Sequence, residues 1–442
     1  MSEQLHCWRR SARILRHLAS SPVHLVSLGA VSAVLLAASP ALAQAAAPLS
    51  LQDALERAIG SDPGLRAADA GIDAARGGLR QARVSPNPEL GAEIENFNGR
   101  GDLRGFQGAE TTFSLSQEIE IGGRRRTRIA LADRELHGAE LDRAIRGLDL
   151  LRDVQTAFYD ALAAEEIVVI EGERLATAEA LARSVSRRVA AARDPLMAGA
   201  RANAGVAEAR IALTRAQAEA ATARAHLESF WGGEQGVTLV RADFALPRAQ
   251  DHDHQALSDS SPDIARLAAG RERASGEAVL QRSLSYQNPT LSLGYRRFED
   301  RDGDGALVAG FSIPLGVFDR NQGAIARAQA ERRRAELDLE AGRRVMAREF
   351  AALERAQASD AQAVRSTEEE VIPEAERALA LAQQGYDRGA FSYLDILEAQ
   401  RSLSDARQRR VEALRSFHSN EAALDRLTGR WAETLPGEEI HR

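Results

Sequence analysis

Two histidines that flank an aspartate form the part of this sequence closest in composition to a metal site. His252 and His254 lie on either side of Asp253, within an acidic stretch from Asp251 to Asp259. Imidazole and carboxylate groups together can hold a divalent cation. A solvated linker has the same composition, and it is the favoured interpretation because neither H-E-x-x-H nor C-x-x-C accompanies the pair. We therefore expect no metal site here.

A second cluster has the spacing that opens a calcium-binding loop. Asp300, Asp302 and Asp304 alternate along the chain, with Gly303 between the last two. Such a loop ends in a glutamate at its twelfth position, where this sequence has Phe311. We therefore interpret this segment as a hairpin turn between two strands.

The sequence contains no arrangement of residues suited to catalysis. Its only cysteine, Cys7, lies near the N-terminus, so the rest of the chain has no thiol nucleophile. The histidines beyond the N-terminal segment stand apart from any catalytic motif: His137, His226, His252, His254, His418 and His441. We expect neither enzyme activity nor a cofactor. The net charge of −7, without a basic patch, also argues against nucleic-acid binding.

Residues 1–43 have the pattern of a secretory signal peptide. Four arginines precede an apolar run from Val23 to Ala38, and Ala41-Leu42-Ala43 offers a cleavage site before Gln44. A membrane anchor is the alternative, but the run is shorter than the ~20 residues that a spanning helix needs. We expect export and cleavage, which would leave a mature chain without cysteine.

The remaining chain is predicted to contain two copies of one unit. Short segments recur about two hundred positions apart in the same order, which indicates an internal repeat. The recurring pairs are Ser61-Asp62-Pro63 with Ser261-Pro262-Asp263, Asn87-Pro88 with Asn288-Pro289, and Phe113-Ser114-Leu115 with Phe311-Ser312-Ile313. We expect the first copy over 49–233, a linker over 234–260, the second copy over 261–430, and a tail over 431–442.

Long helices are predicted in each copy. Shorter helices over 63–84 and 262–286 precede rods over 124–192, 196–231, 323–388 and 393–427. At ~1.5 Å per residue the first rod is about 100 Å long. Ile396, Leu403 and Phe417 fall on one seven-residue register, which is typical of coiled coils. Pro373 should kink the third rod.

Four segments alternate between apolar and polar residues, over about 89–97, 109–121, 289–298 and 306–316. This alternation over about ten residues is typical of transmembrane β-strands. A soluble, half-buried sheet is the alternative. The predicted lipid-facing residues include Leu90, Ile94, Phe113, Leu115, Leu291, Leu293, Phe311 and Ile313. Four strands cannot close a barrel in lipid, so several copies must share one, and three copies would supply twelve strands.

Arginines follow the strands where helices begin. Arg124, Arg125 and Arg126 come after Gly122-Gly123, and Arg320 occupies the corresponding place in the second copy. These arginines would either line the junction between the two parts or anchor the strand ends at the lipid headgroups.

Three stretches carry a family resemblance: FSLSQEIEIGGRRR from Phe113, FSIPLGVFDRNQG from Phe311, and GYDRGAFSYLDILEAQR from Gly385. They resemble the TolC-type outer-membrane efflux family, and most of all its cobalt–zinc–cadmium (CzcC-like) branch. The resemblance implies a mainly α protein with a small transmembrane β part. In it, a homotrimer shares a twelve-stranded β-barrel that continues into a long coiled-coil α-helical barrel.

The resemblance also implies location and partners. The chain is expected in the outer membrane, in contact with its lipid, with a large periplasmic portion. It would dock onto a periplasmic membrane-fusion adaptor and an inner-membrane RND pump. The expected function is a passive export duct for divalent heavy-metal cations. The alternatives are a duct for drugs or other small molecules, and a structural periplasmic coiled-coil protein.

The helical turns are the predicted docking site for the adaptor. They lie near Asp194-Pro195 and near Gly389-Ala390, far from the strands. The candidate residues are Asp194, Pro195, Tyr386, Asp387, Gly389, Tyr393 and Asp395. Copies of these aspartates would form acidic rings that favour cations. Alternatively they solvate or cap helix ends, as Asp395 would in the first turn of its helix. The first copy is degenerate from Arg188 to Met197, so the two turns need not bind alike.

Overall fold

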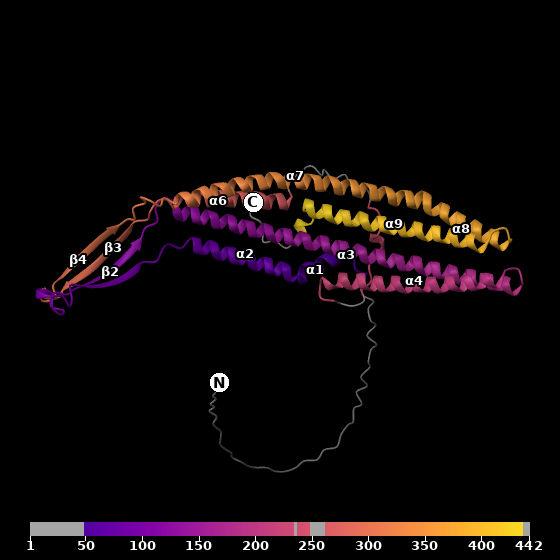
Figure 1. Ribbon diagram of the computed structural model, residues 1–442, viewed down its shortest axis with the longest axis horizontal. Coiled ribbons are helices and arrows are strands. Elements are labelled where there is room, and N and C mark those ends of the chain that lie inside the picture. Colours follow the sequence, from indigo (N-terminus) through magenta and orange to yellow (C-terminus); the bar gives the residue numbers. More distant parts are fainter. Residues whose placement is uncertain (1–47, 234–236, 248–260, 436–442) are drawn as a thin grey trace, which may run out of the picture. The chain divides into compact units, whose positions relative to one another are not determined.

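The computed structural model describes residues 48–233, 237–247 and 261–435. The predicted signal peptide, the His252–His254 pair, His441 and most of the expected linker lie outside these ranges. The described chain is mainly helical with one four-stranded antiparallel sheet, which confirms the fold class expected from the sequence (Figure 1). None of the helices in these ranges combines the length and apolar character needed to cross a membrane.

The two copies share the order helix, hairpin and long helices, but the first has an extra helix at its start and the second has its long rod divided in two. The first contains α1 (Leu51–Ser61), α2 (Pro63–Ala82), β1 (Glu89–Glu95), β2 (Glu110–Glu118), α3 (Arg124–Ala190) and α4 (Leu196–Ser229). The second contains α6 (Pro262–Ser283), β3 (Thr290–Phe298), β4 (Gly305–Ser312), α7 (Gln322–Ser366), α8 (Ile372–Asp387) and α9 (Tyr393–Thr428). Short 3-10 turns lie at Gly101–Leu103, Arg241–Asp243, Glu299–Arg301 and Ala432–Thr434.

Helix α1 was not expected. Ser50 accepts a hydrogen bond from the backbone of Asp53, whose carboxylate accepts one from the backbone of Ser50, so the two form a capping box. Asp62 ends α1, and its side chain then caps the start of α2 by accepting from the backbone of Leu65. One aspartate thus separates two helices where the sequence suggested a single start at Pro63.

The third rod passes through a π-turn before Pro373. A π-helical turn spans Thr367–Val371, and the backbone N–H of Ile372 bonds to the carbonyl of Thr367, five residues earlier. A proline has no N–H to donate, and in an α-helix its ring meets the carbonyl four residues before it. The wider turn relieves both problems, so the helix continues into α8.

The helices lie side by side in one layer (Figure 1). Helix α3 packs against α2 and α6 near the sheet and against α4 and α9 farther away. Helix α7 packs against α6 and α9, and α8 against α9. Near the sheet the order across the layer is therefore α2, α3, α6 and α7. Farther away it is α4, α3, α9 and then α7 or α8. One edge of the layer is formed by α2 and α4, and the other by α7 and α8.

Three apolar cores hold the helices together. The largest surrounds Phe158 and includes Val154, Leu414 and α1. Leu239 and Phe244, in the part of the expected linker that is described, are buried in it. The predicted coiled-coil residues Ile396, Leu403 and Phe417 are all buried, as is Leu424, which falls on the same register. Helix α4 buries Ala202, Ala209 and Ala216 at seven-residue steps, and such small side chains let helices approach closely.

The sheet lies at one end of the helices, in the order β1-β2-β3-β4 (Figure 1). Strands β1 and β2 form one hairpin, β3 and β4 form the other, and β2 pairs with β3 to join the two copies. Strands β1 and β4 are left as open edges. Asp300, Asp302 and Asp304 lie at the β3–β4 hairpin, where Asp302 and Gly303 adopt left-handed backbone conformations.

Candidate functional site

One face of the sheet is apolar and exposed. Leu90 pairs with Leu115, which pairs with Leu293, and cross-strand partners point to the same face. The eight residues predicted to face lipid are all exposed, from 41% for Ile313 to 81% for Leu90. A continuous exposed apolar patch marks a surface meant for a partner or for lipid.

The opposite face of the sheet is polar and internally paired. Arg296 donates to Glu110 at 2.7 Å, to Glu95 at 2.9 Å and to the hydroxyl of Thr112 at 2.9 Å. Ser114 lies on this face opposite Gly294. The alternation predicted from the sequence therefore separates an apolar face from a polar one.

The arginines after β2 hold helix ends. Arg125 donates to the carbonyl of Arg83 at 2.6 and 3.1 Å, and Arg124 donates to the carbonyl of Tyr286 at 2.9 Å. Carbonyls at the C-terminus of a helix lack partners within the helix, so these side chains fix where α2 and α6 end. Arg126 is exposed and is the member of the trio left to face solvent or headgroups.

The two helical turns lie at the other end of the layer and follow the same backbone path. After α3, Ala192 donates to the carbonyl of Val189 at 2.9 Å and Arg193 to that of Arg188 at 2.8 Å. After α8, Gly389 donates to Tyr386 at 2.9 Å and Ala390 to Gly385 at 2.8 Å. Both are Schellman motifs, in which the residue after the helix is left-handed. The φ angle is 54° at Ala192 and 77° at Gly389.

Asp194 and Tyr386 join the two turns. The Tyr386 hydroxyl donates to the Asp194 carboxylate at 2.7 Å, and Arg188 donates to the same carboxylate at 2.9 and 3.1 Å. Arg188 also donates to the backbone carbonyl of Tyr386 at 2.9 Å, and its guanidinium lies 4.5 Å from the centre of the tyrosine ring. We call Arg188, Asp194 and Tyr386 the tip bridge.

The tip bridge shifts the acid–base behaviour of its members. The hydrogen bonds from Arg188 and then Tyr386 hold the pKa of Asp194 below its ordinary value. Burial, followed by the hydrogen bond to Asp194, raises the pKa of Tyr386 to about 12. Asp194 is therefore an anion that Arg188 neutralises, which weakens its candidacy for an acidic ring.

The other candidate residues have separate roles. Asp395 accepts from both the backbone and the hydroxyl of Ser392 at 2.7 Å, so it forms a capping box at the start of α9, and these bonds lower its pKa. Pro195 begins α4 without any side-chain cap. Tyr393 is half-buried against the core near the turns. Asp387 is exposed and has no hydrogen-bond or ion-pair partner within the described residues.

Exposed apolar side chains surround the turns and were not predicted from the sequence. Leu196 is 83% exposed, and Met197, Phe391 and Leu394 are also exposed. Phe391 lies over Gly385, where any larger side chain would clash with its ring. The sequence signal for them was the apolar pair Leu196-Met197, which directly follows Pro195 at a turn. These residues give both turns a surface suited to a protein partner.

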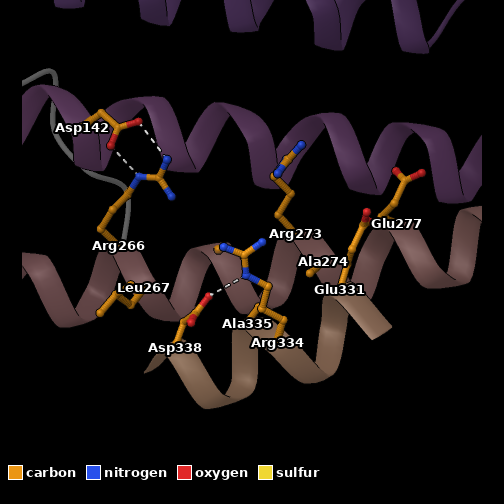
Figure 2. Close-up of a pocket in the computed structure, with 11 residues that line it drawn as sticks. Asp142, Arg266, Leu267, Arg273, Ala274, Glu277, Glu331, Arg334, Ala335 and Asp338 are labelled. Carbon is orange, nitrogen blue, oxygen red and sulfur yellow. Dashed lines mark hydrogen bonds and ion pairs between the residues drawn. The ribbon is translucent and has the colours of Figure 1, made fainter. Parts of the chain in front are cut away.

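The groove between α3, α6 and α7 and the buried His418 have structural roles. A groove of about 570 Å³ lies between α3, α6 and α7 (Figure 2). Arg266 of α6 donates to Asp142 of α3 at 3.0 Å across it, and within α7 the guanidinium of Arg334 lies 3.5 Å from the carboxylate of Asp338. Buried His418 stacks on Tyr159 with 3.8 Å between ring centres. Across the described ranges, no three His, Cys, Asp or Glu side chains gather as a metal-binding group.

Comparisons with known proteins agree with the fold. The sequence profile of the outer membrane efflux protein family matches residues 54–233 and 254–430. The chain is 33% identical over 391 residues to the cobalt-zinc-cadmium resistance protein CzcC of Cupriavidus metallidurans, covering 88% of this chain and 91% of that protein. It is 24% identical to the nickel-cobalt-cadmium resistance protein NccC of Alcaligenes xylosoxydans, covering 76% of this chain and 78% of that protein.

Solved structures show the same arrangement of helices and strands. The outer membrane protein VceC of Vibrio cholerae superimposes with a TM-score of 0.70 at 21% identity, covering 86% of this chain and 96% of that chain. The resemblance expected from the three sequence stretches is thus confirmed. With a profile that spans both copies and a relative of 33% identity along most of its length, the chain belongs to the outer membrane efflux protein family.

Proposed function

We propose that this chain is the outer-membrane export duct of a tripartite efflux pump. The observation that carries the proposal is the sheet, with one apolar exposed face, one polar face and two open edges. An open edge is not tolerated in lipid, because its backbone groups would lack partners. Three copies side by side would pair every edge and form a twelve-stranded barrel around water. A structural coiled-coil protein would have no need of such a face.

The helices would extend the barrel into the periplasm. Helix α3 has 67 residues, which at ~1.5 Å each make a rod of about 100 Å. Residues 1–43 would direct export and then be removed. The duct would be passive: the chain would perform no enzymatic step, and a pump in the inner membrane would supply the energy.

The turns would dock onto a periplasmic membrane-fusion adaptor, linked to an RND pump. Three copies would place six turns in one ring at the periplasmic mouth. The exposed apolar residues Leu196 and Leu394 support this role, as does the exposed carboxylate of Asp387. The tip bridge and Gly389 would shape the docking surface, and Pro195, Tyr393 and Asp395 would set the starts of the helices behind it.

The cargo we propose is divalent heavy-metal cations. The support comes from the relatives CzcC and NccC, which are named for resistance to cobalt, zinc, cadmium and nickel. A second candidate is a larger small molecule, since the chain is also 26% identical to the pyoverdine export protein OpmQ of Pseudomonas aeruginosa. The metal proposal is favoured because the identity to CzcC is higher.

Metal tolerance of cells tests the proposal. A strain whose metal pump and adaptor lack their outer-membrane partner should regain tolerance to cobalt, zinc and cadmium when it expresses this chain. Unchanged tolerance, with the protein present in the outer membrane, would exclude metals as cargo. Restored siderophore export instead would favour the second candidate.

A matched pair of variants tests the lipid-facing assignment. Phe113→Arg places a charge on the apolar face at mid-strand and should cost ~2–4 kcal/mol of membrane stability. Ser114→Arg places the same charge on the polar face, one residue away, and should cost much less. Equal yields of both variants in the outer membrane would show that the assignment of Phe113 to lipid and Ser114 to water is wrong.

A further inference from the structure

Phe318 is the most exposed large apolar side chain among the described residues, at 92%. It lies in the loop between β4 and α7, within the stretch FSIPLGVFDRNQG. An aromatic side chain can bury about 150–250 Å², so leaving one in water forgoes a large apolar contact. Two further apolar residues of this loop, Leu315 and Val317, are also exposed.

The polar residues of the loop hold its backbone in place. Asn321, with a left-handed φ of 58°, donates from its side chain to the carbonyl of Gln281 at 2.7 Å. Its backbone N–H donates to the carboxylate of Asp319 at 2.8 Å. Arg320 donates to the carbonyl of Gly316 at 3.0 Å, and Gln322 to that of Phe318 at 3.2 Å. The loop backbone at Phe318 is therefore held in place, which lowers the entropic cost of binding this side chain.

A groove lies on the opposite edge of the layer. It has a volume of about 610 Å³ and is formed by the end of α2, the chain that leads to β1, and the first turns of α3. Ala82, Val84, Pro86, Leu131 and Ala132 line it with apolar atoms. Arg128 donates to the carbonyl of Val84 at 3.0 Å and so fixes one wall. The groove has the size and lining for an aromatic ring.

The open strand edges bring the loop and the groove together. The chain enters β1 from α2 and leaves β4 for α7, so Val84 and Phe318 both lie at the helical end of the sheet. If β4 of one copy pairs antiparallel with β1 of the next, the chain after Ser312 runs beside the chain before Glu89. This pairing also places the start of α7 of one copy next to the end of α2 of the next copy.

We propose that Phe318 of each copy inserts into the groove between α2 and α3 of the next copy. The contact would lock the ring where the barrel meets the helices. This inference rests on the trimer of the proposed function, and it names the contact by which one copy recognises another. Lipid is the competing occupant, and the test separates the two.

Engineered cysteines test the contact in the detergent-extracted full chain with Cys7→Ser. Val84→Cys with Phe318→Cys should give covalent dimers and trimers on oxidation, seen on non-reducing gels. Val279→Cys with Phe318→Cys is the control. Val279 is 53% exposed and Val84 50%, but Val279 lies on α6, away from the edges of the layer. The control pair should remain largely uncrosslinked.

Light scattering on the same sample distinguishes failure of the trimer from failure of the Phe318 contact. A monomer would overturn the trimer and this contact with it. A trimer that gives no covalent bands, or equal bands for both pairs, would overturn the contact alone. Phe318→Trp should be shielded from brominated lipid in reconstituted vesicles, and strong quenching would assign Phe318 to the lipid instead.

Discussion

The turn between α3 and α4 and the turn between α8 and α9 share one backbone path but are stabilised differently. The second turn has Gly389 at its left-handed position and the Ser392–Asp395 capping box at the start of α9. The first has Ala192 at the left-handed position and no side-chain cap at Pro195. It is stabilised through the tip bridge, by its own Arg188 and by Tyr386 of the second turn. The second turn thus has its own glycine and capping box, whereas the first has neither and uses a side chain of the second turn in their place.

The largest effect should come from removing the hydroxyl of the tip bridge. Tyr386→Phe leaves the Asp194 carboxylate with one partner fewer, and a hydrogen bond to a charged group contributes about 1.5–3 kcal/mol. Hydrogen exchange followed by mass spectrometry should show faster opening of residues 188–197, with residues 387–396 little changed.

Tyr393→Phe is the matched control, since no hydrogen bond from its hydroxyl is seen within the described residues. If Tyr386→Phe loosened both turns equally, the first turn would not depend on the second in the way that the bridge implies.

The tip bridge should also respond to pH at both ends of the scale. The pKa of Asp194 is lowered from 3.8. Its contribution to the stability of the first turn is therefore present above pH 3.8 and lost as the pH falls through the lowered pKa. The pKa of Tyr386 is raised from 10.0 to about 12, so its contribution is complete below pH 10 and lost as the pH rises through about 12. The second turn is held by the Asp395 carboxylate, whose pKa is also lowered, so it should lose stability at low pH but not at high pH.

Phenolate absorbance measures the alkaline limit. The difference between the titrations of the unmodified chain and Tyr386→Phe isolates the phenol of Tyr386. A midpoint near 10 would mean that the tyrosine is neither buried nor bonded to Asp194.

A smaller effect is expected at the glycine of the second turn. No other group lies near a side chain added at Gly389, so Gly389→Val carries only the backbone cost of a left-handed residue, about 1–2 kcal/mol. Opening of residues 385–392 should accelerate, and metal tolerance should fall while outer-membrane insertion is kept. Gly389→Asn is the control, because asparagine tolerates this conformation. Full tolerance in the valine variant would remove Gly389 from the docking surface.

The smallest effect should be a gain in stability. Ala192→Gly removes the strain of a left-handed alanine, and the greater freedom of glycine in the unfolded chain offsets part of this benefit. The net stabilisation of the first turn should be about 0.5–1 kcal/mol. Residues 188–197 should then exchange more slowly. Faster exchange would show that Ala192 is not strained and that the two turns differ less than their sequences suggest.

The parts predictable from the sequence are those encoded by neighbouring residues. Alternation along each strand predicted the apolar face, and Gly389 marked a turn. The Ser50–Asp53 capping box is also encoded locally, and these two residues alone suffice to predict the start of α1. The tip bridge joins Asp194 to Tyr386, which lie far apart in the chain, so no local pattern could reveal it. The left-handed Ala192 was hidden because alanine gives no signal for that conformation.

The π-turn at Thr367–Val371 holds one residue more than an α-turn would. It takes up this residue locally, so the helix on either side keeps the register of an α-helix that is one residue shorter. Deleting Glu369 should therefore restore α geometry and leave the buried residues of α8, Ala375 and Ala382, facing as they do now. Deleting a residue from the regular part of α7 should instead rotate α8 and the turn beyond it by about 100°. The direction in which the second turn faces thus depends on the residue count of a helix far behind it, and only the wide turn can absorb a change of one.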